Sequence, residues 1–275
     1  MIVTSKTLLG RAKAGGYAVP ALNVDNLESV KGVLQACANT GKSVIVQTIP
    51  KTLKYGGIKT YAALVNAIYQ GGADIALHLD HGGDADICKD CISAGYTSVM
   101  IDGSALPFEE NVRLTAEVVR YAHARGVSVE GELGTIGGKE ETENAVSYTD
   151  PGEAAEFATA TGVDALAVGV GTAHGVYKGT PHIAVDRIGQ IAARTPVPLV
   201  LHGASGLSDK VVRECIEAGI CKINFATQLR QAFTSGLKAS LAAHPEAFDP
   251  KIYLPQAVES VRRAAEEIIR LCYGM

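Results

Sequence analysis

The feature that most limits the fold of this chain is one unit repeated eight times: a short apolar segment, a polar turn and an amphipathic stretch. The segments expected to be strands are Tyr17–Asn23, Ser43–Thr48, Asp74–Leu79, Ser98–Asp102, Ser128–Glu132, Ala165–Gly169, Pro198–Leu201 and Cys221–Asn224. Strands that alternate with helices are typical of a parallel sheet. Eight such units over about 250 residues, without linker-like composition, favour one α/β domain over residues 1–275. We expect a (β/α)8 TIM barrel rather than a doubly wound sheet.

The amphipathic stretches predict helices between the strands and one more near the end of the chain. They are Leu27–Ala38, Tyr61–Gln70, Ala85–Ala94, Glu109–Ala124, Pro151–Thr161, Ala184–Arg194, Ser208–Ala218, Gln228–Ala242 and Ala257–Leu271. Two longer segments without periodicity, Gly134–Thr149 and Gly171–His182, are expected to be loops on the face of the barrel that carries active sites. The first is rich in glycine and acidic residues, and we expect it to be mobile.

Charge and composition limit the classes of partner. The formal net charge is −4, and no run of basic residues predicts binding to nucleic acid or to an anionic membrane. No apolar run approaches the roughly 18 residues of a membrane helix. We therefore expect a small-molecule partner. The six cysteines lack the spacing of a disulfide framework and the N-terminus lacks a signal-peptide pattern, which predicts a cytoplasmic protein. Cys88 and Cys91 are expected to be packing residues.

Polar side chains stand at the carboxyl ends of the later predicted strands. They are Asp80, His81, Asp102, Glu132, His174, His202 and Asn224. The carboxyl ends of barrel strands converge on one rim, so side chains far apart in the chain can meet there. One histidine on a rim is usually a hydrogen-bonded structural residue, but three imidazoles with a vacant fourth position are the ligands of a catalytic zinc ion. His78 lies on the same strand face as Asp80 and is expected to orient a neighbouring site residue.

Two further groups on this rim predict binding of charged species. Asp102 and Glu132 would be costly if buried without a cation, which leaves open a lysine partner or a second, weaker metal position. Glycine-rich turns and a helix start follow strands six to eight, where backbone N–H groups and the helix dipole favour a phosphate. The candidate phosphate-binding residues are Gly175, Lys178, Gly179, Gly203, Ala204, Ser205, Gly206, Ala226 and Thr227.

The blocks that carry these residues resemble the class II, zinc-dependent ketose-bisphosphate aldolases. They are His78–Gly82, Ser98–Gly103, Glu132–Gly138, Gly171–Lys178, Leu201–Gly206 and Ile223–Asn224. The resemblance covers essentially the whole chain. It is strongest to the branch that contains fructose- and tagatose-bisphosphate aldolases, and it implies a homodimer or homotetramer.

The resemblance implies a role for each rim residue. His81, His174 and His202 would bind Zn²⁺, with Asp102 and Glu132 at a second position for a divalent or monovalent cation. Asp80, Glu140 and Asn224 would be catalytic, Asp80 as the acid/base and Glu140 as the carboxylate of the mobile loop. Dihydroxyacetone phosphate would be held by Gly175, Lys178, Gly203, Ala204, Ser205, Asn224, Phe225, Ala226 and Thr227.

The implied chemistry suits these residue types. Cleavage of the C3–C4 bond of a ketose 1-phosphate leaves negative charge on the three-carbon phosphate, which Zn²⁺ stabilises as a Lewis acid. Asp80 would take the proton of the C4 hydroxyl. Glu140 would close over the site and protonate the three-carbon product.

The residues expected at the distal end of the substrate depart from the family pattern, because Ile49 stands where the family has a serine or threonine that helps bind the C6 phosphate. The segment Glu266–Arg270 also contains no secure match to the basic residue that a neighbouring subunit supplies in the family. Lys51, Gln47 or a neighbouring arginine could replace these contacts. We favour instead a different distal group, such as a carboxylate, a sulfonate or an uncharged group.

Three alternatives remain from the sequence. A Schiff-base aldolase would use Lys222 in the eighth strand. A metal-dependent barrel hydrolase would be expected to carry a His-x-His pair in strand one, which Val19–Asn23 lacks. A non-catalytic sugar-phosphate binder would have little use for Asp80 beside a metal.

Overall fold

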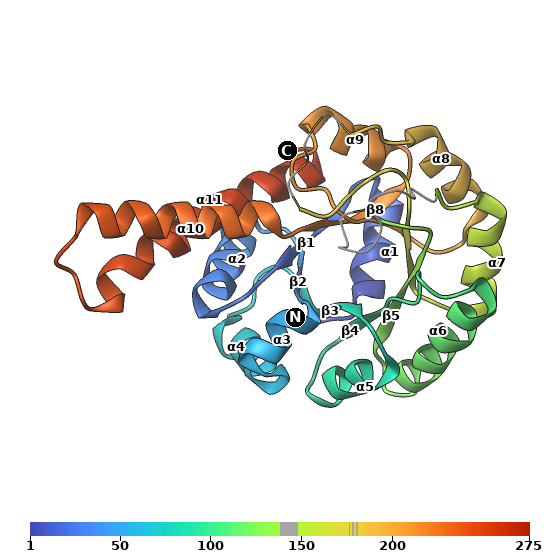
Figure 1. Cartoon of the computed structure of the whole chain (residues 1–275), viewed down its shortest axis with the longest axis horizontal. Coiled ribbons are helices and arrows are strands. Elements are labelled where there is room, and N and C mark those ends of the chain that lie inside the picture. Colours follow the sequence, from blue (N-terminus) through green and yellow to red (C-terminus); the bar gives the residue numbers. More distant parts are fainter. Residues whose placement is uncertain (138–147, 176, 178, 180) are drawn as a thin grey trace.

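Eight parallel strands close into a barrel in chain order, and β1 pairs with β8 (Figure 1). The computed structural model describes residues 1–137, 148–175, 177, 179 and 181–275. The strands are β1 (Val19–Asn23), β2 (Val44–Thr48), β3 (Ile75–Gly82), β4 (Ser98–Ile101), β5 (Ser128–Leu133), β6 (Ala165–Val168), β7 (Leu199–Leu201) and β8 (Ile220–Phe225). The predicted TIM barrel is confirmed, and each strand overlaps its predicted segment.

Helices connect the strands, and most of them cover the outer face of the barrel. They are α1 (Ser5–Gly15), α2 (Leu27–Thr40), α3 (Pro50–Gly56), α4 (Ile58–Ile68), α5 (Ala85–Ser93), α6 (Phe108–His123), α7 (Pro151–Thr161), α8 (Val185–Arg194), α9 (Asp209–Glu217), α10 (Thr227–Ala243) and α11 (Pro250–Tyr273). The sequence did not predict α1 or α3, and α11 begins earlier than expected. Its start is set by Asp249, whose side chain accepts from the Lys251 N–H, with Pro250 in the first helical turn.

Helix α1 closes the amino end of the barrel. Its apolar residues Leu8, Leu9 and Ala12 are buried in one cluster with inward-facing strand residues such as Ile45 and Met100. At the start of the helix, the Ser5 Oγ lies 2.7 Å from that of Ser98 and 2.8 Å from that of Ser128, the first residues of β4 and β5. Because this end is filled, a substrate must enter at the carboxyl ends of the strands.

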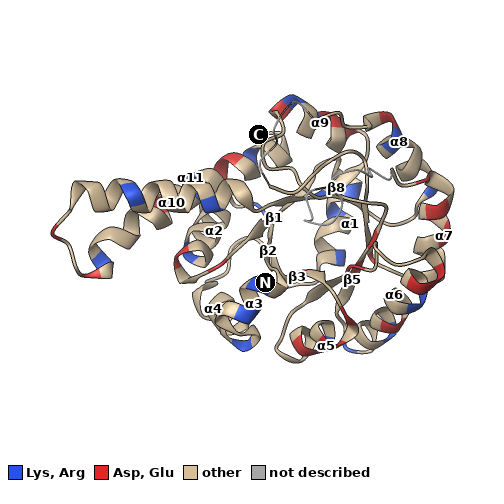
Figure 2. Ribbon diagram, in the orientation of Figure 1, with Lys and Arg blue, Asp and Glu red and all other residues tan. Residues whose placement is uncertain are grey.

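The last two helices form an arm that extends away from the barrel (Figure 1). Helix α10 packs along α11, and α11 also packs on α2. Phe248, in the segment of chain that connects the two helices, is 93% exposed. Acidic and basic residues are interspersed along the outer helices (Figure 2). Within the described part of the chain, no helix is both long and apolar enough to span a membrane.

Candidate active site

The rim at the carboxyl ends of the strands brings three predicted metal ligands together. His81 belongs to the end of β3, His202 directly follows β7, and His174 lies in the loop after β6. Ligand nitrogens of the three rings all lie within 4.8 Å of one another. His174 is held in place by its backbone N–H, which donates to the Gly137 carbonyl at 2.8 Å. The structure therefore assembles the histidine cluster that strand-end reasoning predicted.

The orientation of the His81 and His202 rings indicates which nitrogens are available to a cation. The His81 Nδ1 lies 2.9 Å from Asp102 Oδ2, and the His202 Nε2 lies 2.9 Å from Glu130 Oε1. A carboxylate only accepts hydrogen bonds, so each of these nitrogens carries the proton of its ring. The remaining nitrogens, His81 Nε2 and His202 Nδ1, face each other at 3.0 Å.

Two ring nitrogens this close must share either a proton or a metal ion, because two bare lone pairs at this distance would repel each other. Adjacent nitrogen ligands of a tetrahedral zinc ion are about 3.3 Å apart when each Zn–N bond is about 2.0–2.1 Å. The distance between the facing nitrogens is close to that value, and each ring has a carboxylate behind it, as zinc-bound histidines commonly do. The donor set and its geometry therefore fit a zinc ion held by three imidazoles.

The electrostatics of the two rings differ sharply. Burial holds the pKa of His202 well below its usual value, and the neighbouring His81 lowers it further. Burial also acts to lower the pKa of His81, but Asp80, Asp102 and Glu132 outweigh it and raise that pKa to about 9. In the metal-free protein the shared proton therefore belongs to His81. Metal binding must displace this proton, because a histidine binds a metal only through an unprotonated ring nitrogen.

Asp80 is fixed beside the histidines by two amide side chains. Asn224 Nδ2 donates to Asp80 Oδ1 at 3.0 Å, and Gln47 Nε2 donates to Asp80 Oδ2 at 3.1 Å. Gln47 is itself held by Asn23 Oδ1 at 2.8 Å. Burial acts to raise the pKa of Asp80, but the rings of His81 and His202 outweigh it, so the pKa lies below its usual value. The carboxylate is therefore charged, oriented and able to accept a proton.

The two predicted second-position carboxylates also lie at this centre. His81, Asp102 and Glu132 form a second group of potential metal ligands whose atoms lie within 4.8 Å of one another. Asp102 accepts from the Ser104 hydroxyl at 2.7 Å. The buried lysine of the barrel interior, Lys222, pairs with Glu130 instead. Lys222 is therefore not the lysine partner that one of the two sequence interpretations gave to these carboxylates, and the grouping of their oxygens with His81 fits the other, a second cation position.

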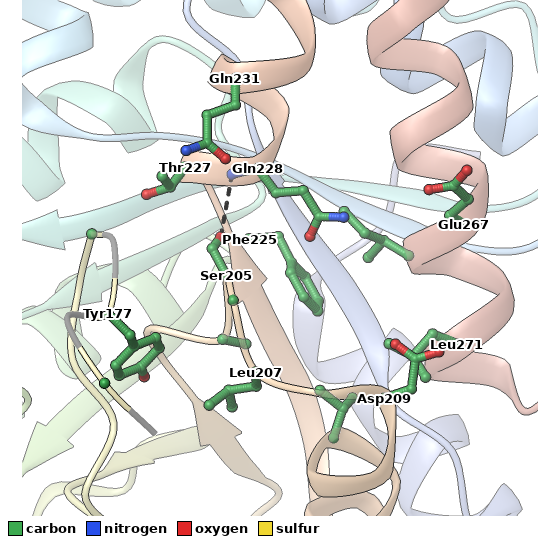
Figure 3. A pocket seen from close by; sticks show the side chains of 16 residues that line it. Tyr177, Ser205, Leu207, Asp209, Phe225, Thr227, Gln228, Gln231, Glu267 and Leu271 are labelled. Carbon is green, nitrogen blue, oxygen red and sulfur yellow. Dashed lines mark hydrogen bonds between the residues drawn. The ribbon is translucent and has the colours of Figure 1, made fainter. Parts of the chain in front are cut away.

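Two cavities meet at the predicted phosphate residues. One, of about 460 Å³, contains Asp80, His81, His174 and Asn224 and is also lined by Gly175, Gly203, Ser205, Ala226 and Thr227. The other, of about 610 Å³, is lined by Gly175, Ala204, Ser205, Phe225 and Thr227 (Figure 3). Helix α10 begins at Thr227. In its first turn the Gln228 N–H donates to the Ser205 hydroxyl at 3.5 Å. Glu140 and Lys178 lie outside the described residues.

The sequence analysis missed residues that act on the site from inside the strands. Glu130 supports His202, while Gln47 and Asn23 form the chain that holds Asp80. A signal for Glu130 existed, because it lies two residues before Glu132 and so on the same face of β5. His78 contacts Ser98 Oγ at 2.7 Å and Lys222 Nζ at 3.4 Å rather than a predicted metal ligand.

Lys222 is poorly placed to form a Schiff base. Its side chain is fully buried, and its Nζ lies 2.6 Å from Glu130 Oε2. It does not line the cavity that contains Asp80. A substrate carbonyl could reach this amine only after the ion pair had opened and the barrel interior had rearranged, so the geometry disfavours the Schiff-base alternative.

The loops after β6 and β7 are joined so tightly that Gly203 is expected to be irreplaceable. The Tyr177 hydroxyl donates to the Gly203 carbonyl at 2.7 Å and accepts from the Ala173 N–H at 3.0 Å. Gly203 has a φ of 66°, and a Cβ there would lie 2.5 Å from the Ala173 carbonyl oxygen. We expect Gly203→Ala to push His174 and His202 apart, lowering both the free energy of unfolding and zinc affinity.

The control for this variant is Gly175→Ala, because Gly175 also has a positive φ but an added Cβ would meet no atom of the described residues within 4 Å. Gly175→Ala is expected to cost only the backbone strain, about 1–2 kcal/mol, in denaturant unfolding. Equal losses of stability and of zinc affinity in the two variants would show that the contact at Gly203 is unimportant.

A closed parallel barrel that carries histidines, carboxylates and two cavities on its open rim is typical of a TIM-barrel enzyme. The sequence model of the family described as class-II fructose-bisphosphate aldolase matches residues 3–274. The chain belongs to the class II fructose-bisphosphate aldolase family and is an aldolase, a carbon–carbon lyase. Zinc is the usual cofactor of this class.

Solved structures agree with this assignment. The YdjI aldolase from Escherichia coli K12 is 33% identical, with a TM-score of 0.89 over 99% of this chain and 97% of that chain. A putative fructose-1,6-bisphosphate aldolase from Coccidioides immitis is 30% identical, with a TM-score of 0.84 over 97% and 94%. The fructose-bisphosphate aldolase Fba from Campylobacter jejuni, 23% identical, shares the fold with a TM-score of 0.84 over 98% and 95%.

Proposed function

We propose that this aldolase is zinc-dependent and reversibly cleaves a ketose 1-phosphate to dihydroxyacetone phosphate and an aldehyde. The observation that carries this proposal is the pair of facing ring nitrogens of His81 and His202, 3.0 Å apart, beside a fixed carboxylate. His174 completes the proposed ligand set. When bound, zinc supplies Lewis-acid stabilisation of the negative charge that develops on the three-carbon product.

Asp80 carries the proton transfer at C4 in this proposal. During cleavage its carboxylate accepts the proton of the C4 hydroxyl, the C3–C4 bond breaks, and its electron pair stays with the three-carbon phosphate. In condensation the same oxygen returns the proton to the aldehyde oxygen. Gln47 and Asn224 hold the carboxylate in one orientation, since each donates to a different oxygen. The proposed proton donor to C3, Glu140, lies outside the described residues and remains a prediction.

The cradle between the two cavities is proposed to hold the 1-phosphate. Ser205 and Thr227 line both cavities, and Thr227 begins α10. The start of this helix offers backbone N–H groups and the positive end of the dipole to an anion. Binding here would leave C3 and C4 of the ketose between the cradle and Asp80.

The distal end of the cavity supports a substrate that does not carry a second phosphate. Ile49, Lys51 and Arg230 line this end. Arg230 Nε and Nη2 lie 2.7 and 3.0 Å from the two oxygens of Asp25, so a carboxylate already offsets the guanidinium charge. With its charge offset, Arg230 attracts a phosphate dianion less strongly, which leaves Lys51 to bind the distal group and favours a carboxylate or sulfonate monoanion or an uncharged group. We infer that such a group stands at C6.

The deciding measurement is kcat/KM over a panel of 1-phosphorylated ketoses that differ at C4 and C6, with dihydroxyacetone phosphate detected as product. If no ketose in the panel released dihydroxyacetone phosphate, the proposed reaction would be contradicted. We expect a 1-phosphate with a C6 carboxylate to exceed fructose 1,6-bisphosphate. A bisphosphate better than every alternative by tenfold or more would overturn the inferred C6 group while leaving the reaction intact.

Lys51→Gln tests the distal contact in the protein. With an anionic C6 group, kcat/KM is expected to fall about tenfold or more, since a hydrogen bond to a charged group contributes about 1.5–3 kcal/mol. With fructose 1-phosphate, which has no charge at C6, it should change little. Lys54→Gln is the matched control, because Lys54 is exposed on the same helix α3 but does not line the cavity. Equal effects of the two variants would exclude a role for Lys51.

A further inference from the structure

A chain of buried polar groups inside the barrel leads away from the proposed metal site. Glu130, Lys222, His78 and His202 are each fully buried. Glu130 uses its two oxygens for two partners: Oε1 lies 2.9 Å from His202 Nε2, and Oε2 lies 2.6 Å from Lys222 Nζ. None of the steps proposed above uses Glu130 or Lys222 directly.

The far side of Lys222 continues this chain to the closed end of the barrel. Lys222 Nζ lies 3.4 Å from His78 Nε2, and His78 Nδ1 lies 2.7 Å from Ser98 Oγ. Ser98 Oγ is 2.7 Å from Ser5 Oγ, which belongs to α1. Hydrogen bonds thus connect a ligand histidine on the open rim with the helix that closes the other end.

The donors and acceptors in this chain allow one consistent placement of protons. An ammonium group only donates, so His78 Nε2 must accept from Lys222 and His78 Nδ1 must carry the ring proton. Burial holds the pKa of His78 well below its usual value, which agrees with a neutral ring. At the other end Glu130 only accepts, so His202 must donate from Nε2 and keep its lone pair on Nδ1. Reversal of the His202 tautomer would place two acceptors 2.9 Å apart.

We propose that Glu130, held by Lys222, is a positioning residue that keeps the Nδ1 lone pair of His202 directed at the metal. The inference rests on the proposed metal site. A buried ion pair contributes little net stability, because desolvation of both charges offsets their attraction. Here the pair has a geometric consequence, since an oxygen anchored by Lys222 limits the movement of the carboxylate and hence of the imidazole that it supports.

Glu130→Gln tests this role with a nearly isosteric change. The amide oxygen can still accept from Lys222, which turns the NH2 group toward His202 Nε2. That nitrogen must then accept, so the ring proton moves to Nδ1 and blocks the metal. We expect zinc affinity, measured by competition with a chromophoric chelator, to fall about 10–100-fold. The matched control is Glu117→Gln, which changes an exposed Glu–Lys pair with a 2.9 Å separation and should leave zinc affinity unchanged.

The double variant Glu130→Leu/Lys222→Met separates hydrogen bonding from charge balance. It removes both buried charges, so no unpaired charge remains in the barrel to destabilise the fold. It also leaves no acceptor at this position for His202 Nε2, so zinc affinity should be as low as in Glu130→Gln. Recovery of wild-type affinity would mean that charge imbalance caused the loss, and this would overturn the proposed role of Glu130.

The protonation of His202 can also be measured directly on the zinc-loaded wild-type protein, without any substitution. Nitrogen-15 NMR of labelled histidines should show His202 protonated at Nε2 and not at Nδ1. Protonation at Nδ1 would overturn the inference, and so would wild-type zinc affinity in Glu130→Gln. In either case zinc binding by the wild-type protein would leave the proposed function intact. Failure of the wild-type protein to bind zinc would instead overturn the proposed metal site, and the inference with it.

Discussion

Removal of bound metal by a strong chelator is expected to abolish aldol cleavage, and addition of Zn²⁺ or Co²⁺ is expected to restore it. The charge that develops when the C3–C4 bond breaks needs a counter-charge beside C2. His81 and His174 line the cavity beside Asp80, and their ligand nitrogens lie within 4.8 Å of that of His202. Lys222, the alternative source of electrophilic activation, is buried in an ion pair with Glu130. Loss of the metal should therefore remove the electrophile that stabilises this charge.

The control for metal removal is borohydride treatment in the presence of substrate, which traps a Schiff base. No covalent adduct should form at Lys222, and the treated enzyme should regain activity once zinc is restored. His202→Ala should lose the same activity without chelator, because a buried ligand is missing. Full activity in a sample verified to be metal-free would contradict zinc dependence, and a trapped adduct would support the Schiff-base mechanism.

Replacement of Asp80 by alanine is expected to lower kcat by about 10²–10⁴-fold, the usual contribution of a positioned general acid or base. Asp80 lines the cavity beside His81, and its two oxygens accept from Asn224 and Gln47. Alanine removes the proton acceptor, while the three histidines remain. Zinc content should therefore match that of the wild-type protein, and KM should change less than kcat.

Asp86→Asn is a suitable control for loss of an aspartate, because its carboxylate lies on the exposed surface of α5. It should retain wild-type kcat. Asp80→Asn adds a sharper comparison, since it keeps the shape of the side chain but removes its basicity. If Asp80→Ala cleaved the substrate at a near wild-type rate, another group would have to accept the C4 proton.

The sequence predicted the barrel well because each strand is a short apolar run that ends at a polar turn, and both can be recognised from neighbouring residues alone. It missed α1, which precedes the repeating units and buries only a narrow stripe that includes Leu8 and Leu9. It missed α3 because Pro50 opens a helix of only seven residues, which resembles a turn. In both cases tertiary packing, not local propensity, stabilises the helix.

The site was predictable where chemistry follows a strand end. His81, His174 and His202 could be grouped because the carboxyl ends of all barrel strands converge, whatever the details of packing. Gln47 and Glu130 could not be assigned in the same way. Each points into a barrel whose facing residues come from distant parts of the chain, so the partner of each depends on the register and tilt of the strands.

By itself the sequence determined the TIM barrel and the histidines that meet on the rim, because these follow from local periodicity and from the order of the strands. The aldolase family was indicated by the resemblance of the rim motifs to that family. Only the tertiary structure decided which oxygen supports each imidazole, that Lys222 neutralises Glu130, and that Asp25 offsets Arg230 beside Ile49. Hydrogen bonds and ion pairs depend on distances of a few tenths of an ångström, and those distances exist only after residues remote in sequence have packed together.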